Sequence, residues 1–257
     1  MINIVNGDCL KEMQSIEDKS VNLILTDLPY GETRSKWDKI LDFDKLWEHY
    51  LRVITDNGAI VLFGNEPFSS MLRQSQPNYY RYDWKWIKNR ATGFANCNYR
   101  PMRSYEDIMV FSKANASAGG KSNPMVYNPQ GLEPINKVKK NTANRKGLIS
   151  YNNNNLGENN SLNGDSEYVQ KFTNYPNNLL YFDCEKKYVH PTQKPLELMK
   201  YLVLTYSNEN DLVLDSCMGS GTTGVACKEL NRNFIGIEID SKYFDIACGR
   251  LDISNIF

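Results

Sequence analysis

Apolar residues follow two alternating patterns along this chain. Short continuous apolar runs predict strands buried on both faces of a sheet, at 2–5, 21–26, 59–63, 82–87, 108–111, 212–214 and 234–239. Between them, apolar residues at helical spacing predict helices at 43–54, 67–74, 195–206, 222–230 and 243–251. We expect the pair Asn57-Gly58 to end the first of these helices. The pattern predicts an α/β fold with a doubly wound, mostly parallel, Rossmann-like sheet, which binds ligands beyond the carboxyl ends of its strands.

The composition changes between residues 112 and 183. This stretch is rich in Asn, Gly, Ser, Lys and Tyr, has few apolar runs, and includes the four-Asn tract 152–155. Such a composition is typical of an inserted segment with disordered parts, although its tyrosines favour some ordered structure. We therefore expect one domain formed by 1–111 and 184–257, interrupted by an insert at 112–183.

Charge is balanced overall but unevenly distributed. The 257 residues include 30 Lys and Arg and 30 Asp and Glu, whereas the stretch from Arg81 to Lys146 has 13 basic and four acidic residues, a local net charge of +9. A basic middle region favours a polyanionic partner such as a nucleic acid. A solvated charged surface without a ligand is the alternative.

The cysteines and the apolar windows bear on metal binding and location. The six cysteines form no C-x-x-C pair and the chain has two histidines, so zinc-binding spacing is absent and we expect no metal ion. No apolar window has the length of a membrane span. We therefore expect a protein of the reducing cytoplasm that does not bind a membrane.

A glycine-rich loop follows the strand predicted at 212–214. Asp215 is followed by Ser-Cys-Met-Gly-Ser-Gly-Thr-Thr, in which the glycines let the backbone approach a nucleoside and the helix N-terminus at Thr222 favours a carboxylate or phosphate. Glu238, at the end of the next strand, is placed to accept ribose hydroxyls. The string at 219–224 also matches G-x-G-x-x-G, so a nicotinamide or flavin enzyme is an alternative, as is a tight turn without a ligand.

A second motif, Asp27-Leu28-Pro29-Tyr30, follows the strand predicted at 21–26. The exocyclic amine of a base is a poor nucleophile, because its lone pair is delocalised into the ring. A carboxylate from Asp27 and a carbonyl from Leu28 or Pro29 can accept its two N–H bonds, and Tyr30 can hold the base flat. An ordinary turn after a strand is the alternative interpretation.

In this order the two motifs resemble those of the β-class DNA amino-methyltransferases. The family pattern D/N/S-P-P-Y/F/W is matched with Leu28 in place of the first proline. The family loop D-P-F-x-G-S-G-T-T is matched with Ser216 and Cys217 in place of Pro and Phe. The resemblance extends over nearly the whole chain through the segments 6–9, 103–107 and 190–195.

The resemblance implies S-adenosylmethionine as the cofactor. The residues implied to bind it are Asp8, Cys9, Asp27, Lys194, Asp215, Gly219, Ser220, Gly221, Thr222 and Glu238. In this assignment Asp8 meets the cofactor adenine and Lys194 lies near the cofactor carboxylate. The implied catalytic residues are Asp27, Leu28, Pro29 and Tyr30.

The resemblance also implies double-stranded DNA as the partner, with the insert at 112–183 as the target-recognition region, and leaves a homodimer open. The basic residues of the insert that can hold phosphates are Lys137, Lys139, Lys140, Arg145 and Lys146. An aspartate at position 27 resembles the adenine-N6 enzymes, whereas serine is common in the cytosine-N4 enzymes. We expect an adenine-N6 enzyme; the alternatives are a cytosine-N4 enzyme, an RNA methyltransferase, a nicotinamide-dependent oxidoreductase and a DNA-binding module without activity.

Overall fold

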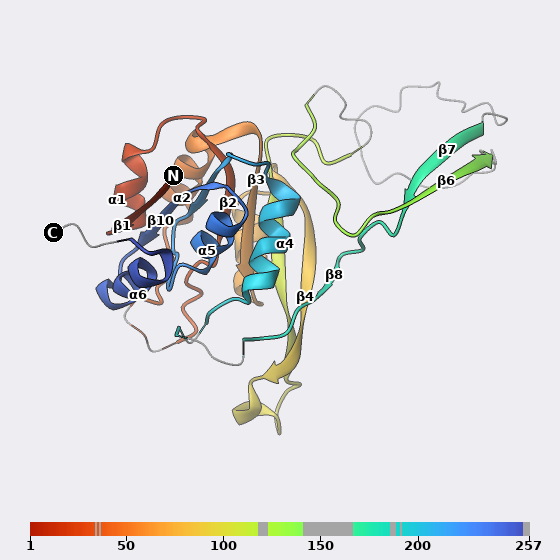
Figure 1. Cartoon of the computed structure of the whole chain (residues 1–257). Helices are drawn as coiled ribbons and strands as arrows, with labels where there is room; N and C mark the ends of the chain where they lie inside the picture. Colours follow the sequence, from red (N-terminus) through yellow and green to blue (C-terminus); the bar gives the residue numbers. More distant parts are fainter. Residues whose placement is uncertain are drawn as a thin grey trace. The chain divides into compact units, whose positions relative to one another are not determined.

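The computed structural model describes residues 1–33, 35, 37–117, 123–140, 167–185, 189–190 and 192–253 (Figure 1). Its helices are α1 (Cys9–Glu12), α2 (Phe43–Val53), α3 (Phe68–Ser75), α4 (Leu196–Tyr206), α5 (Thr222–Glu229) and α6 (Ser241–Leu251), with 3-10 turns η1 (Met13–Ser15) and η2 (Phe94–Asn96). Its strands are β1 (Ile2–Asn6), β2 (Val21–Thr26), β3 (Ile54–Gly64), β4 (Tyr80–Thr92), β5 (Arg103–Phe111), β6 (Glu133–Lys140), β7 (Glu167–Thr173), β8 (Leu179–Tyr181), β9 (Leu212–Asp215) and β10 (Asn233–Glu238).

Eight strands form one sheet in the order β1-β10-β9-β2-β3-β5-β4-β8. The five strands from β1 to β3 pair in parallel with their neighbours. β5 runs antiparallel to both β3 and β4, and β8 pairs parallel to β4. The predicted doubly wound, mostly parallel α/β sheet is therefore confirmed, with one reversed strand that the apolar pattern did not indicate.

Both faces of the sheet are covered by helices. Leu23 and Leu25 of β2 belong to a hydrophobic core that includes residues of α4, α5 and α6. Ile24 of the same strand belongs to a second core, on the other face, which includes residues of α1, α2 and α3. Because successive side chains of a strand point to opposite faces, burial on both faces requires a continuous apolar run, which Leu23-Ile24-Leu25 provides in β2.

The connection from α2 to β3 differs from the expected one. α2 is capped by Asp42, whose side chain accepts from two backbone N–H groups of the first turn, and it ends at Val53. β3 begins directly at Ile54, so the expected helix stop at Asn57-Gly58 is wrong. Gly58 instead lies within β3, where a Cβ atom would come within 2.7 Å of the backbone oxygen of Asn22 on β2.

Contacts divide the chain into two compact units. The larger unit is Met1–Asn128 with Asn177–Phe257, and the smaller unit is Pro129–Pro176, in which the structure describes the antiparallel pair of β6 and β7. The segment that is compact by itself is thus shorter than the insert expected at 112–183, and β8 belongs to the large sheet. None of the helices that the structure describes is long and apolar enough to cross a membrane.

Candidate active site

The two motif loops meet at the carboxyl edge of the sheet. Asp27 follows β2, Asp215 ends β9 and Glu238 ends β10, and these three strands are adjacent. Glu106 reaches the same edge because β5 runs in the opposite direction and begins there. All four carboxyl groups line one cavity of about 680 Å³, a size within the range of small-molecule and cofactor sites.

The Asp27 loop is fixed by its own side chains. Leu28 is 3% exposed and packs in the core that contains α2 and α3. The hydroxyl of Tyr30 donates to Asp27 Oδ1 at 2.5 Å, and its ring lies 4.8 Å, between centroids, from that of Phe68. Asp27, Leu28, Pro29 and Tyr30 all line the cavity, so this loop presents a carboxylate beside an aromatic ring.

Asp38 holds the backbone that follows this loop. Its carboxylate accepts hydrogen bonds from the N–H of Gly31 at 2.8 Å and from the N–H of Thr33 at 2.5 Å. Burial opposes its ionisation, but the hydrogen bonds hold the pKa of Asp38 below its usual value. Gly31 has a φ of +72°, which favours glycine, and the turn therefore keeps Tyr30 beside the cavity.

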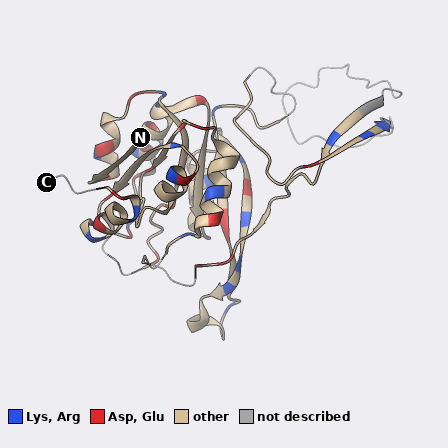
Figure 2. Ribbon diagram, viewed as in Figure 1, with Lys and Arg blue, Asp and Glu red and all other residues tan. Residues whose placement is uncertain are grey.

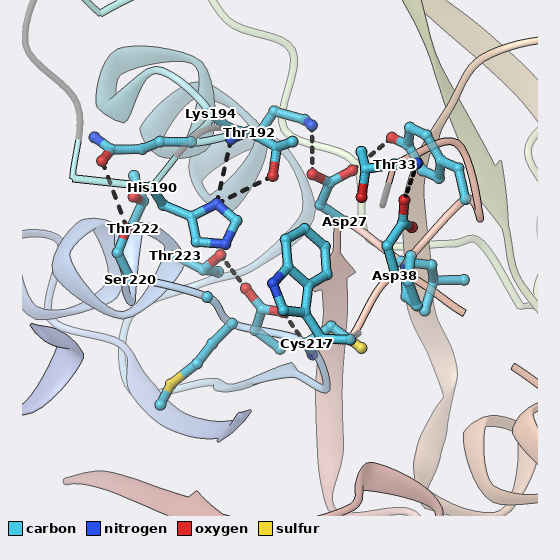
Figure 3. A pocket seen from close by; sticks show the side chains of 18 of the residues that line it. Asp27, Thr33, Asp38, His190, Thr192, Lys194, Cys217, Ser220, Thr222 and Thr223 are labelled. Carbon is cyan, nitrogen blue, oxygen red and sulfur yellow. Dashed lines mark hydrogen bonds and ion pairs between the residues drawn. The ribbon is translucent and has the colours of Figure 1, made fainter. Parts of the chain in front are cut away.

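A buried row of alternating charges lies against Asp27. Lys194 Nζ is 2.5 Å from Asp27 Oδ2 and 3.2 Å from Glu106 Oε2, and Lys88 pairs with the other carboxylate oxygen of Glu106. The side chains of Lys194, Glu106 and Lys88 are 7–9% exposed, so solvent ions screen these pairs weakly. Figure 3 shows Lys194 pointing at Asp27 on one side of the cavity, with His190 between them and the glycine-loop residues Ser220 and Thr222.

The pKa values of Asp27, Lys194 and Glu106 are shifted by burial and by their neighbours' charges. Burial raises the pKa of Asp27; the charge of Lys194 opposes this rise and that of Glu106 adds to it. Burial disfavours the charge on Lys194, but Asp27 and Glu106 together hold its pKa above the usual value. Burial also disfavours ionised Glu106, yet the two lysines hold its pKa below the usual value. Lys194 thus bridges two carboxylates of the protein, whereas the sequence led us to expect it beside the cofactor carboxylate.

Asp215 ties the glycine loop to its neighbours. Its Oδ2 accepts from Thr223 Oγ1 at 2.5 Å, and its Oδ1 accepts from Thr26 Oγ1 at 3.1 Å and from the N–H of Cys217 at 3.2 Å. Burial raises the pKa of Asp215 to about 7, against the effect of these hydrogen bonds. Its carboxylate therefore links β2, the loop and α5 at the wall of the cavity.

Glu238 fixes the other side of the same loop. Its Oε2 accepts from the N–H of Gly219 and its Oε1 from the N–H of Asp240, both at 2.8 Å. Each carboxylate oxygen keeps a further acceptor position, so Glu238 can still receive hydroxyl groups. Gly219, with a φ of +53°, lines the cavity, whereas a Cβ atom on Gly221, with a φ of +77°, would meet Ala247 of α6 at 3.0 Å. Gly221 therefore faces α6.

Arg250 of α6 holds the loop at the start of α5. Its Nη1 lies 2.7 Å from the backbone oxygen of Ser220, 2.9 Å from Ser220 Oγ and 3.0 Å from Thr222 Oγ1. Ser220 and Thr222 line the cavity, where the N-terminal N–H groups of α5 favour an anionic group.

Three aromatic rings gather beside the cavity. The ring centre of His190 lies 5.4 Å from that of Trp37 and 4.0 Å from that of Tyr243. Burial, and next the charge of Lys194, lowers the pKa of His190 to about 4, so its imidazole is neutral near pH 7. Trp37 and His190 therefore offer uncharged flat surfaces to the cavity that they line.

The start of the chain completes the wall of the cavity. Asp8 and Cys9 line it after β1, and Asp8 caps α1 by accepting from the N–H of Leu10 at 2.9 Å.

A hydrogen bond with Cys9, together with burial, raises the pKa of the Cys217 thiol well above its usual value. A protonated thiol is a poor nucleophile. Within the described residues, no group of three His, Cys, Asp or Glu side chains is placed to hold a metal ion.

The basic residues expected to hold phosphates lie outside the larger unit. Lys137 and Lys139 are exposed on β6, and Lys140 is the last residue of that strand. Arg145 and Lys146 lie outside the described residues. The structure thus places three of the five on one strand of the smaller unit.

Several residues of this site were not predicted from the sequence. For Glu106 the sequence does carry a signal, since it lies in the segment 103–107 that resembles the family. No pattern in the sequence indicates a role in the site for Asp38, Trp37 or Arg250. They lie outside the motifs, and only the folded chain brings them near the cavity.

The chain is similar to known DNA methyltransferases over nearly its whole length. It is 28% identical over 262 residues to the type II methyltransferase M.HpaI of Haemophilus parainfluenzae, a match that covers 97% of this chain and 74% of that one. It is 29% identical over 270 residues to the DNA adenine methyltransferase YhdJ of Escherichia coli (strain K12), covering 98% and 83% respectively.

Two solved structures share the fold. The crystal structure of the M1.HpyAVI-SAM complex matches with a TM-score of 0.63 at 27% identity and covers 98% of this chain and 100% of that one. The PvuII DNA methyltransferase (cytosine-N4-specific) matches with a TM-score of 0.63 over 100% of this chain and 88% of that one, and at 15% identity it shows the fold alone.

The profile of the DNA methylase family matches residues 21–248. With the family, the predicted cofactor S-adenosylmethionine is confirmed. The chain therefore belongs to the DNA methylase family of N6 and N4 amino-methyltransferases.

Proposed function

We propose that this chain transfers the methyl group of S-adenosylmethionine to the N6 amine of adenine in DNA. The observation that supports this most is the carboxylate of Asp27, placed beside the ring of Tyr30 in the cavity that the glycine loop also lines. An aspartate at this position resembles the adenine-N6 enzymes. YhdJ, whose match covers 98% of this chain, is named as an adenine methyltransferase.

The residues of the cavity fit S-adenosylmethionine. In this proposal Glu238 accepts the ribose hydroxyls with its remaining acceptor positions. Ser220, Thr222 and the first N–H groups of α5 receive the cofactor carboxylate. Asp8 and Cys9 lie at the cofactor adenine, while Gly219 lets the backbone approach the ligand. Asp215 and Gly221 act through the loop, since their contacts fix its shape.

The cofactor supplies a methyl group on a sulfonium, which an amine can attack directly. Asp27 accepts one N–H of the adenine amine and the backbone carbonyl of Leu28 or Pro29 accepts the other, so that the nitrogen gains sp³ character. The charge of Lys194 favours the ionised form of Asp27 and opposes the rise in its pKa that burial causes. The N–C bond forms as the S–C bond breaks, and the amine proton leaves to Asp27 or to water. Position and electrostatics supply the catalysis, with no covalent enzyme intermediate.

The target base is held outside the duplex in this mechanism. The amine of a paired base is engaged in its Watson–Crick bond, so the Asp27 loop cannot surround it there. Tyr30 provides the stacking surface, and Pro29 restricts the loop backbone. The insert at 112–183 selects the sequence, and Lys137, Lys139 and Lys140, with Arg145 and Lys146, contact phosphates.

Identification of the methylated base tests this proposal. Unmethylated genomic DNA is incubated with the purified protein and S-adenosylmethionine, digested to nucleosides and analysed by mass spectrometry. We expect N6-methyldeoxyadenosine as the product. N4-methyldeoxycytidine would assign the cytosine alternative, and methylation confined to added RNA would assign an RNA enzyme. If the protein binds S-adenosylmethionine but leaves the DNA unmethylated, the proposed methyltransferase activity is contradicted.

A further inference from the structure

The hairpin formed by β4 and β5 extends past the carboxyl edge of the sheet and ends at η2 (Figure 1). The pairing of β4 with β5 reaches Thr92 and Arg103 at its outer end. Alternate residues along the outer part of β4 line the cavity: Trp86, Lys88, Arg90 and Thr92. The tip at 93–102, which we call the hairpin tip, therefore continues directly from the wall of the cavity.

Aromatic side chains of the hairpin tip are exposed. Phe94 is 76% exposed and Tyr99 is 90% exposed. Single exposed apolar residues are common on proteins, but two nearly free rings on one short turn, next to the cavity, indicate a surface that another molecule covers.

The outer part of the hairpin, which includes the hairpin tip, is also positively charged. From Trp84 to Tyr105 the chain has five Lys or Arg and no Asp or Glu, and Figure 2 shows the outer hairpin without acidic residues. Three of these cations, Lys85, Lys88 and Arg103, pair with carboxylates. Arg90 and Arg100 are exposed and form no ion pair with any residue that the structure describes. Their charge is thus available to a polyanion.

We propose that the hairpin tip contacts duplex DNA beside the base that enters the cavity. Arg100 of the tip and Arg90, near the end of β4, bind backbone phosphates. Phe94 and Tyr99 stack on bases left without a neighbour when the target base leaves the helix, a role that apolar and aromatic side chains fill in proteins that deform DNA. The inference rests on the proposed function, in which the target base leaves the duplex. An enzyme that acts on an unpaired base would leave no gap in the stack for these rings to fill.

The role of Arg90 and Arg100 is tested by DNA binding. Affinity of the S-adenosylhomocysteine-bound protein for a fluorescent mixed-sequence duplex is measured over a series of salt concentrations. The double variant Arg90→Gln/Arg100→Gln should bind more weakly and flatten the slope of log affinity against log salt by about 2, since each lost phosphate contact removes about 0.9. Lys45→Gln, a control on α2 whose side chain is 67% exposed, should keep the wild-type slope. A wild-type slope in the double variant would overturn the phosphate contacts.

The rings of the hairpin tip are tested by methyl transfer. Phe94→Ala and Tyr99→Ala should each lower the rate on unmethylated genomic DNA by about fivefold or more, because the stacking of one base contributes at least that factor. Phe94→Trp and Tyr99→Phe should retain most of the rate, since the ring face is kept. The control Tyr181→Ala removes a ring that is 70% exposed on β8 and should behave as wild type. Equal rates in the alanine variants and wild type would overturn the stacking role.

Two further readouts separate the possible failures. Calorimetric binding of S-adenosylmethionine should be unchanged in the Phe94 and Tyr99 variants, because no residue of the hairpin tip lines the cavity. Wild-type protein without methylation of DNA would contradict the proposed function, whereas an active wild type with unaffected hairpin variants would contradict only the present inference. Single-stranded RNA could instead compete for the protein more strongly than duplex DNA. If the Phe94→Ala and Tyr99→Ala variants lost this preference, the tip would be assigned to RNA, and the proposed contact with duplex DNA would be overturned.

Discussion

Replacing Lys194 by methionine should move the acid limb of the rate–pH profile to higher pH. Methionine has a similar length, keeps apolar contact near Phe63, whose ring centre lies 4.9 Å from Lys194 Nζ, and removes the charge. Burial raises the pKa of Asp27 and Lys194 is the charge that opposes this rise, so the variant should raise that pKa further. Because a protonated Asp27 is a weaker acceptor than the carboxylate and cannot take up the amine proton, the rate should be lost as pH falls through the shifted pKa.

The separation of the charges sets the size of this effect. Two unit charges 2.5 Å apart attract by about 7 kcal/mol at an effective dielectric constant of about 20, an upper limit because desolvation of both partners opposes it. If a fifth of this, about 1.4 kcal/mol, acts on the ionisation of Asp27, the rate on the acid limb falls about tenfold. Single-turnover transfer of a radiolabelled methyl group, at saturating cofactor and DNA across a pH series, measures the limb.

Glu106→Gln should shift the acid limb in the opposite direction, and Lys88→Met serves as the control. The charge of Glu106 adds to the raised pKa of Asp27, so its removal should move the acid limb to lower pH, by less than the Lys194 shift. Lys88 pairs with Glu106 and not with Asp27, and its loss should leave the limb near that of wild type. Thermal unfolding checks that each variant is folded. Identical limbs in Lys194→Met and wild type, or shifts of one sign in both charge variants, would refute the reasoning.

Three further outcomes are expected. Tyr30→Ala should lose more methyl-transfer activity than Tyr30→Phe, because the ring face holds the base, although Phe also loses the hydrogen bond to Asp27; equal rates would count against stacking. Glu238→Ala should weaken S-adenosylmethionine binding by about 1–3 kcal/mol in a calorimetric titration, and unchanged affinity would reject the ribose contact. The pKa of His190, about 4 in the fold, is below its unfolded value of 6.5. Its contribution to stability is therefore complete above pH 6.5 and lost as pH falls toward 4, by about 1–3 kcal/mol after solvent screening. Urea unfolding of His190→Gln should show a shallower loss over this range, and an unaltered pH dependence would contradict the burial of a neutral ring.

The sequence predicted the parallel core of the fold well, because its strands are buried on both faces. The apolar run of β2 is followed by Asp27, the apolar run of β9 ends in Asp215, and the sheet places both carboxylates at one edge. Strands with one solvated face were less predictable. β4 was expected at 82–87 but spans Tyr80–Thr92, since its outer end is a polar hairpin outside the core.

Contacts between distant segments could not be predicted from local patterns. Lys194 and Asp27 are 167 residues apart, and their ion pair depends on the turn before α4 lying over the end of β2. Glu106 enters the same row only because β5 runs antiparallel, which no apolar period indicates. The resemblance located Lys194 in the site, but its partners required the structure.

The central claim is that separate loops hold the cofactor and the target amine, and Asp27→Asn tests it most directly. Cofactor affinity and methyl transfer are measured on one preparation of this variant, which keeps the shape of the side chain and removes its charge. The account predicts S-adenosylmethionine affinity close to that of wild type, with methyl transfer reduced by about 100- to 1,000-fold. Transfer near the wild-type rate, or a loss of cofactor affinity as large as the loss of activity, would contradict it.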